Sequence, residues 1–207
     1  MRFIVATRSK ETADEIRWAA KDTPDLEVYF GSFESVPSFD CVATAGNSFG
    51  LMDAGMDLAV LKFFGFELQS LIQKKIIEEF YGEQPVGTAF LVETGRLDHP
   101  YVAHVPTMRV PMNIAGTDHI YLATWATLIA AGRHNRSANR KIETLVCPAF
   151  GAGTGGMTGI EVGFQMKLAW QHFKKPPVVI NPSFAQERQD KIHYGGKMGF
   201  EHPAKRI

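Results

Sequence analysis

Short apolar runs alternate along the chain with stretches in which apolar residues recur every three or four positions. The apolar runs predict strands at residues 3–6, 26–30, 41–45, 86–92, 101–105, 145–150 and 178–181. The periodic stretches predict helices at residues 11–20, 56–64, 67–80, 118–131 and about 160–173. This alternation of strands and helices predicts an α/β sandwich built around a mixed, mostly parallel sheet.

Two stretches lack this periodicity. Residues 132–141 are polar and basic, and we interpret them as a solvated loop. Residues 183–207 have no clear period and are expected to pack as an extended arm. A length of 207 residues favours one domain over two. We therefore expect a single domain over residues 1–207, with a core at about 26–181 and a C-terminal arm at about 183–207.

Composition and charge exclude several classes of protein. The 22 Lys and Arg residues balance the 22 Asp and Glu residues, which argues against general electrostatic binding of nucleic acids. Two cysteines allow at most one disulfide, so the chain is not a disulfide-rich scaffold. The N-terminus lacks the pattern of a signal peptide, and no apolar run approaches the length of about 18 residues that a membrane span needs. We expect a cytoplasmic protein with no membrane segment.

The strongest chemical signal is a glycine-rich loop between the predicted strand at 145–150 and the predicted helix at 160–173. Residues 148–159 read PAFGAGTGGMTG. Glycines let the backbone approach a ligand closely, and exposed N–H groups near the start of a helix attract phosphates. In open α/β sheets, ligands bind at this turn from strand to helix. The loop therefore predicts a phosphate cradle, the alternative being a tight turn that merely uses glycines.

The residues in and after this loop narrow the class of phosphate group that it could bind. The spacing Gly151-x-Gly153-x-x-Gly156 matches a dinucleotide fingerprint, but the acidic residue expected about 20 residues later is absent. The Gly-Lys-Ser/Thr of an ATPase phosphate loop is absent too, and no basic residue lies between Phe150 and Gln165. Backbone dipoles alone would then hold the anion. This suits a diphosphate ester better than a phosphoryl group in transfer.

A second polar loop follows the predicted strand at 41–45, and residues 43–57 read ATAGNSFGLMDAGMD. The Asn47 amide can donate and accept hydrogen bonds and the Asp57 carboxylate can accept them, a pairing that suits ribose hydroxyls. Two alternatives remain. Asn47 can serve as a turn residue, and Asp57 can compensate the dipole of the helix that it begins.

The sequence gives little support for a metal centre or for a nucleophilic cysteine or serine. The seven histidines are scattered, so we expect no metal site and no cofactor. Cys41 and Cys147 fall in predicted strands, where buried, inert thiols are expected. No serine lies in a G-x-S-x-G elbow. Any catalysis should therefore use water and substrate positioning, with no covalent enzyme intermediate.

Together the two loops resemble those of the macro domain family. That family has a strand leading into Asn-Ala-Ala-Asn and a glycine run ending Gly-Val-Asp-Gly, matched here by residues 44–47 and 54–57. Its later loop, Pro-Ala-Ile-Ser-Thr-Gly-Ile-Tyr-Gly-Phe, aligns without a gap with residues 148–157, and residues 102–106 resemble its Ile-His-Thr-Val strand. Order and spacing agree from about Leu26 to Asn181. The resemblance implies a three-layer α/β/α sandwich and a pocket for ADP-ribose.

The resemblance also implies roles for particular residues. Asn47 and Asp57 would contact the distal ribose and assist catalysis, and the loop at 151–156 would hold the diphosphate. The ligand-binding residues implied or suggested in this way are Ser32, Phe33, Gly46, Gly55, Met56, Phe150, Gly151, Ala152, Gly153, Thr154, Gly155, Gly156, Met157 and Phe184. Phe184 follows the last predicted strand and would stack on adenine, the alternative being a packing residue.

Three positions depart from the family's pattern. Gly31-Ser32 stands where the family has Gly-Asp, whose carboxylate binds the adenine amino group. Thr44 replaces the first Asn of the Asn-Ala-Ala-Asn motif. Gly155 and Met157 occupy the stretch where the family carries an aromatic residue over the distal ribose. These changes predict an altered base end and a more open distal end.

Two hypotheses about function follow. The first is a hydrolase that removes a substituent from the distal ribose of ADP-ribose, either an ADP-ribosyl ester on a protein or a 1″-phosphate. The second is a binding module that holds ADP-ribose or a related nucleotide without turnover. A nicotinamide-dependent oxidoreductase is more remote, because the acidic residue after the strand at 178–181 is missing. The expected partners are ADP-ribose or a related nucleotide and an ADP-ribosylated protein.

Overall fold

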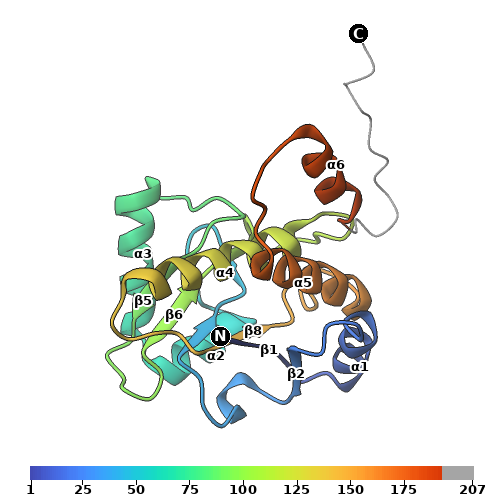
Figure 1. Cartoon of the computed structure of the whole chain (residues 1–207). Coiled ribbons are helices and arrows are strands. Elements are labelled where there is room, and N and C mark those ends of the chain that lie inside the picture. Colours follow the sequence, from blue (N-terminus) through green and yellow to red (C-terminus); the bar gives the residue numbers. More distant parts are fainter. Residues whose placement is uncertain (193–207) are drawn as a thin grey trace.

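The computed structural model describes residues 1–192, and it contains a six-stranded sheet with the order β2-β1-β8-β3-β6-β5 (Figure 1). The strands are β1 (Arg2–Thr7), β2 (Leu26–Phe30), β3 (Cys41–Ala43), β5 (Phe90–Glu93), β6 (Tyr101–His104) and β8 (Thr144–Pro148). Neighbours from β2 to β6 pair in parallel, and β5 pairs antiparallel with β6. The predicted mixed, mostly parallel sheet is confirmed.

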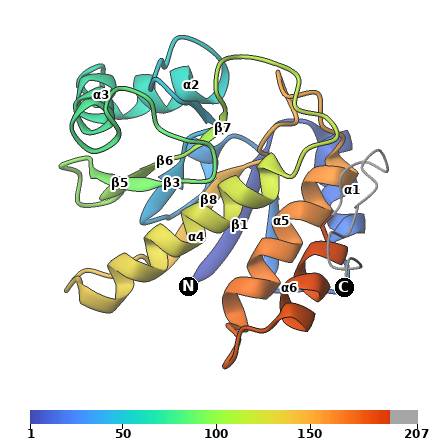
Figure 2. The ribbon, with the colours of Figure 1, turned by 90° about the horizontal axis from the view of Figure 1, so that it is seen from above.

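Helices cover both faces of this sheet (Figure 2). One face carries α1 (Lys10–Ala19), α4 (His119–Ser137) and α5 (Gly159–Lys174). The other carries α2 (Gly55–Phe64), α3 (Glu67–Phe80) and the short 3-10 helix η1 (Phe33–Ser35). The three-layer α/β/α arrangement that the resemblance implied is therefore present.

The strands supply two hydrophobic cores because successive side chains point to opposite faces of a sheet. In β1, Phe3 and Val5 pack under α1, α4 and α5, whereas Ile4 packs under α2 and α3. Both faces are covered, so the central strands read as continuous apolar runs. Cys41 and Cys147 are fully buried, and burial raises the pKa of both thiols, so they stay protonated.

Several predicted elements differ from the structure. The run at 178–181 is not a strand, and Val178, Val179 and Ile180 are exposed. Pro176 and Pro177, just before the run, disfavour regular pairing.

The predicted C-terminal arm is also different. Residues 182–190 form the helix α6 (Pro182–Asp190), with Pro182 in its first turn and the Asn181 side chain accepting a hydrogen bond from the backbone N–H of Phe184. Residues 193–207 of the arm lie outside the described residues.

Three smaller corrections concern element ends. The helix α4 continues to Ser137, so most of the predicted loop at 132–141 is helical. The strand β5 starts at Phe90, after a turn with Gly87 at a φ of +88°. A small parallel pair, β4 (Gly46–Asn47) with β7 (Pro106–Met108), was not predicted. Within residues 1–192, no helix is both long and apolar enough to span a membrane.

Candidate functional site

The carboxyl ends of five parallel strands meet at one edge of the sheet, and the loops that follow them surround a groove. Backbone hydrogen bonds tie these loops together, from Gly31 N to the carbonyl of Thr7 (2.9 Å) and from Ala149 N to the carbonyl of Ala6 (3.3 Å). The groove has two adjoining parts. The inner hollow, about 210 Å³, lies between the loops after β3 and β8, and the outer hollow, about 770 Å³, lies beside the ends of β1 and β2.

The helix α2 runs beside both hollows, and its first residues, Gly55 and Met56, line each of them. Pro148, Ala149 and Gly153 are shared as well. The two hollows are therefore continuous along α2, and an elongated ligand can occupy both.

The glycine loop after β8 is folded tightly on itself. Gly151 has a φ of +73° and its carbonyl accepts a hydrogen bond from Met157 N at 3.1 Å. A Cβ atom at Gly155 would lie 2.6 Å from the carbonyl oxygen of Gly151, so only glycine fits there. Within residues 1–192, the backbone N–H groups of Gly153 and Thr154 have no hydrogen-bond partner. These N–H groups are free to bind an anion in the inner hollow.

The helix α5 begins directly after this loop because of a capping box. The Thr158 side chain accepts a hydrogen bond from the backbone N–H of Glu161, whose carboxylate accepts one from Thr158 N. The carboxylate of Glu15 on α1 accepts a further bond from Gly159 N at 2.8 Å. These contacts fix the end of the loop relative to α5 and α1.

Asp57 lies in the first turn of α2 and is 5% exposed. Its Oδ1 accepts a hydrogen bond from the backbone N–H of Ala45 at 3.0 Å. Burial raises the pKa of Asp57 to about 7, with a smaller increase from Asp53; the bond from Ala45 opposes both. A carboxyl group at the wall of the inner hollow thus titrates near neutral pH.

The Asn47 side chain is largely used within its own loop. Its Nδ2 donates to the carbonyl of Leu51 at 2.8 Å, and its Oδ1 accepts from Phe49 N and Leu51 N at 3.1 and 3.3 Å. Asn47 lines the inner hollow but is only 8% exposed. The turn role that the sequence left open is therefore present in the structure.

A buried histidine lies behind Gly46. His104 is fully buried, and burial lowers its pKa to about 3, so the ring is neutral. Because Gln84 Nε2 donates to Thr88 O, Gln84 Oε1 is the acceptor, and His104 Nδ1 donates to it at 2.6 Å. His104 Nε2 then carries the lone pair and has no partner among the described residues. A Cβ atom at Gly46 would lie 2.7 Å from this nitrogen.

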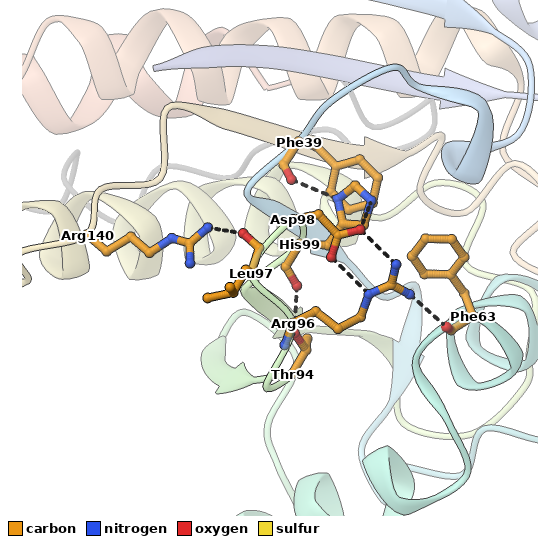
Figure 3. Close-up of polar contacts among 8 residues, drawn as sticks. All are labelled: Phe39, Phe63, Thr94, Arg96, Leu97, Asp98, His99 and Arg140. Carbon is orange, nitrogen blue, oxygen red and sulfur yellow. Dashed lines mark hydrogen bonds and ion pairs between the residues drawn. The ribbon is translucent and has the colours of Figure 1, made fainter.

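The outer hollow has an aromatic wall formed by Phe33 and Phe63, whose rings meet edge to face at 5.4 Å. Arg96 lies against Phe63, one of these two aromatic residues (Figure 3). Its guanidinium lies 4.6 Å from the Phe63 ring centroid, donates to the carbonyl of Phe63 at 3.3 Å, and pairs with Asp98 at 2.8 Å.

Most of the residues proposed from the sequence line the groove. The inner hollow contains Gly46, Asn47, Asp57, Gly151, Thr154 and Gly155, the outer hollow Ser32, Phe33 and Ala152, and both hollows Gly55, Met56 and Gly153. Four others, Phe184 among them, do not line it. Phe150 and Met157 point into the core, and Gly156 packs against Asn113.

Phe184 lies far from the expected base position. It lines a separate hollow with Asp25, His172 and Arg188, beside the start of β2 and the end of α5. That is the opposite edge of the sheet from the glycine loop. The prediction that Phe184 stacks on adenine depended on a strand at 178–181, and it fails with that strand.

Sequence reasoning missed the contribution of β1 to this site. Thr7, Arg8, Ser9 and Thr12 line the outer hollow, as does Lys62 from α2. The signal for the first three was present, because they follow the carboxyl end of a strand that the sequence predicted. Within residues 1–192, no group of three His, Cys, Asp or Glu side chains could hold a metal ion.

A family model described as the Macro domain matches residues 43–162. An uncharacterized protein of Aquifex aeolicus is 29% identical over 133 residues, 64% of this chain and 73% of the relative. An uncharacterized protein of Aeropyrum pernix is 28% identical over 144 residues, 70% of this chain and 69% of the relative.

Solved structures give the same fold. The macrodomain of Mycobacterium tuberculosis DarG has a TM-score of 0.53 at 24% identity and covers 66% of this chain and 84% of its own. The Oceanobacillus iheyensis macrodomain with ADP has a TM-score of 0.56 at 16% identity, covering 78% and 86%. Thermosipho africanus DarTG in complex with ADP-ribose has a TM-score of 0.53 at 15% identity, covering 90% and 56%.

Proposed function

Because this chain belongs to the Macro domain family, we propose that its groove binds ADP-ribose or an ADP-ribose derivative. Related macrodomain structures hold ADP or ADP-ribose, which supports this ligand class. The free N–H groups of Gly153 and Thr154 suit a diphosphate that no charged side chain of the loop would clamp. The inner hollow would then take the distal ribose and the outer hollow the nucleoside.

We further propose that the protein hydrolyses a substituent at the distal ribose, either an ADP-ribosyl ester or a 1″-phosphate. The observation that carries this proposal is Asp57, a buried carboxyl group beside the inner hollow with a pKa of about 7. A general base works best when its pKa lies near the operating pH. Asp57 would accept a proton from the attacking water while the substituent leaves and takes up a proton from solvent.

One observation favours the second hypothesis, a binding module without turnover. The Asn47 amide makes three hydrogen bonds inside its own loop, so it has little capacity left for a ribose hydroxyl. Asp57 would then stabilise the loop and α2, and the groove would hold an ADP-ribosylated protein or free ADP-ribose without reaction.

Calorimetric titration with ADP-ribose tests binding, with AMP, ADP and NAD as comparison ligands. We expect micromolar binding of ADP-ribose that exceeds that of AMP. No binding, or equal binding of AMP, would refute the proposed ligand.

Turnover is tested on ADP-ribose 1″-phosphate and on an ADP-ribosylated protein, with Asp57→Ala as the variant. Turnover by the wild type that Asp57→Ala abolishes, with folding and ADP-ribose binding retained, supports the hydrolase. Tight binding without turnover of either substrate supports the binding module.

A further inference from the structure

We propose that the outer hollow binds a second phosphate group, carried by the ribose at the base end of the nucleotide, through Arg8 and Lys62. This inference rests on the proposed function, because it assumes that the groove holds an ADP-ribose-like ligand with its base in the outer hollow. It narrows the ligand class to nucleotides phosphorylated on that ribose.

The charges of the two hollows differ. The inner hollow is lined by two acidic residues, Asp53 and Asp57, and by no cation. The outer hollow is lined by two cations, Arg8 and Lys62, and by one acid, Glu34. A ligand that spans the groove therefore meets acidic side chains at its distal ribose, and more cationic than acidic side chains at its base end.

The two cations are not used within the protein. Within residues 1–192, neither the Arg8 side chain nor the Lys62 side chain makes an ion pair, a hydrogen bond or a ring contact. Other arginines near the site are paired, Arg96 with Asp98 and Arg109 with Glu83. Arg8 and Lys62 are therefore available to a ligand without breaking an existing contact.

The topology places Arg8 between the two ends of the ligand. Arg8 follows β1, which lies between β2 and β8 in the sheet. The end of β2 leads to Ser32 and Phe33 at the base end, and the end of β8 leads to the glycine loop at the diphosphate. A side chain leaving β1 at this edge is therefore close to the ribose that joins base and diphosphate.

Lys62 approaches the same region from α2. It lies seven residues after Gly55, which is a rise of about 10 Å along the helix. Gly55 lines both hollows, whereas Lys62 lines the outer one alone. Lys62 is therefore displaced from the acidic end, beyond the diphosphate.

The start of α1 adds to the positive potential. Ser9 caps this helix and Thr12 lies in its first turn, and both line the outer hollow. A helix N-terminus carries a partial positive charge. The hydroxyl groups of Ser9 and Thr12 can each donate a hydrogen bond to a phosphate oxygen.

A phosphate is the group that best matches this arrangement. A neutral base gains little from two cations, and the diphosphate already has the backbone of the glycine loop. Arginine offers paired donors and lysine a point charge, both suited to phosphate oxygens. Because position 32 is a serine, the outer hollow has, among the described residues, no carboxylate besides Glu34 that would repel the anion.

The test compares two ligands by calorimetry at low salt, ADP-ribose and ADP-ribose 2′-phosphate. We expect the wild type to bind the phosphorylated ligand about tenfold more tightly. Arg8→Gln and Lys62→Gln should each reduce this ratio several-fold, and the double variant should bring it close to one. Added salt should also lower the ratio, since exposed charges are screened.

The matched control is Lys74→Gln, which removes an exposed lysine on α3 that pairs with Glu78 and lines neither hollow. This variant should keep the wild-type ratio. Equal affinity of the wild type for the two ligands, or a ratio that survives the double variant, would overturn the proposal while ADP-ribose binding stands.

A second pair of probes identifies the phosphorylated carbon and separates the two proposals. Adenosine 2′,5′-bisphosphate and adenosine 3′,5′-bisphosphate are each compared with AMP. Tighter binding of either bisphosphate supports a second phosphate site, even if ADP-ribose itself fails to bind. If no nucleotide binds at all, both the proposed function and this inference are wrong.

Discussion

The carboxylate of Asp57 accepts a hydrogen bond from the backbone N–H of Ala45, 12 residues earlier in the chain, at 3.0 Å. This bond connects the loop after β3 to the first turn of α2, two of the segments that line the inner hollow. It favours the ionised carboxylate, whereas burial favours the protonated form and dominates, so the pKa reaches about 7. The group that positions the loop is also the group whose charge changes near neutral pH.

Asp57→Asn should therefore change the pH dependence of stability. The pKa of Asp57 is higher in the folded state than in the unfolded chain, so the contribution of Asp57 to wild-type stability falls as pH rises from about 4 to 7 and then levels off. Asparagine removes this loss, which amounts to about 1.4 kcal/mol for each pH unit in that range. The gain of Asp57→Asn over the wild type should grow to roughly 2–4 kcal/mol at pH 8.

Urea denaturation of both proteins between pH 4 and pH 8 measures this difference. Any effect of asparagine that does not depend on pH shifts the two curves by a constant. Parallel curves would show that Asp57 has an ordinary pKa, and the argument for a general base would lose its support.

Gly46 and His104 should be energetically coupled. A Cβ atom at Gly46 would lie 2.7 Å from His104 Nε2, and the ring cannot withdraw because Nδ1 is bonded to Gln84 in the core. We expect Gly46→Ala to lower the free energy of unfolding by about 1–3 kcal/mol, as overpacked cores do. In the background of His104→Ala, which empties the space, the same change should cost much less.

A double-mutant cycle of denaturation midpoints, with unchanged m-values, measures this coupling. Gly153→Ala serves as a control for adding a methyl group to a glycine of the groove, because nothing lies within 4 Å of that Cβ. Equal costs of Gly46→Ala in the two backgrounds would contradict the contact.

Two glycines of the same loop should behave in opposite ways. Gly155→Ala brings its Cβ to 2.6 Å from the Gly151 carbonyl and should destabilise the fold. Gly153 is exposed and unobstructed, so Gly153→Glu should fold with near wild-type stability. Its carboxylate would face the diphosphate of the proposed ligand, and we expect at least about a tenfold loss of ADP-ribose affinity.

Thermal denaturation and calorimetry of the two variants separate these effects. Gly153→Gln is the matched variant without the charge, and it should lose less affinity than Gly153→Glu. If Gly153→Glu binds ADP-ribose as well as the wild type does, the diphosphate does not lie against this loop.

The helices of the α2–α3 layer could be predicted closely because their buried faces repeat at helical spacing. In α3, Leu68, Ile72 and Ile76 are buried, and the predicted range 67–80 is also the observed one. The run at 178–181 misled because an apolar run does not say whether the sheet has a place for it. In the structure this run lies outside the sheet and its apolar side chains are exposed.

The residues of the candidate site likewise fall into two groups: those that local sequence could locate and those that only the fold brings together. Gly46, Gly153 and Asp57 could be located from local sequence, because each belongs to a glycine-rich segment that links a predicted strand to a predicted helix. Arg8 and Lys62 lie 54 positions apart and have no local pattern, so only the fold brings them to one hollow. Their assigned roles stay predictions until ligands are measured.

Arg96 should influence ligand affinity without touching the groove. It holds Phe63 by a hydrogen bond to the backbone carbonyl and by lying over the ring (Figure 3). Phe63 lines the outer hollow beside Phe33. A cation–π contact at an exposed site contributes roughly 0.5–1 kcal/mol. Arg96→Ala should therefore lower the melting temperature slightly and weaken ADP-ribose binding by about two- to fivefold, consistent with that energy.

Asp98→Asn is the matched control, since it removes the charge that pairs with Arg96 and leaves both contacts to Phe63 in place. Exposed ion pairs add little to stability, so this variant should keep nearly the wild-type affinity. Equal losses of affinity in Arg96→Ala and Asp98→Asn would mean that the ion pair, and not the support of Phe63, shapes the wall. An unchanged affinity in Arg96→Ala would mean that the base end of the ligand does not rest on Phe63.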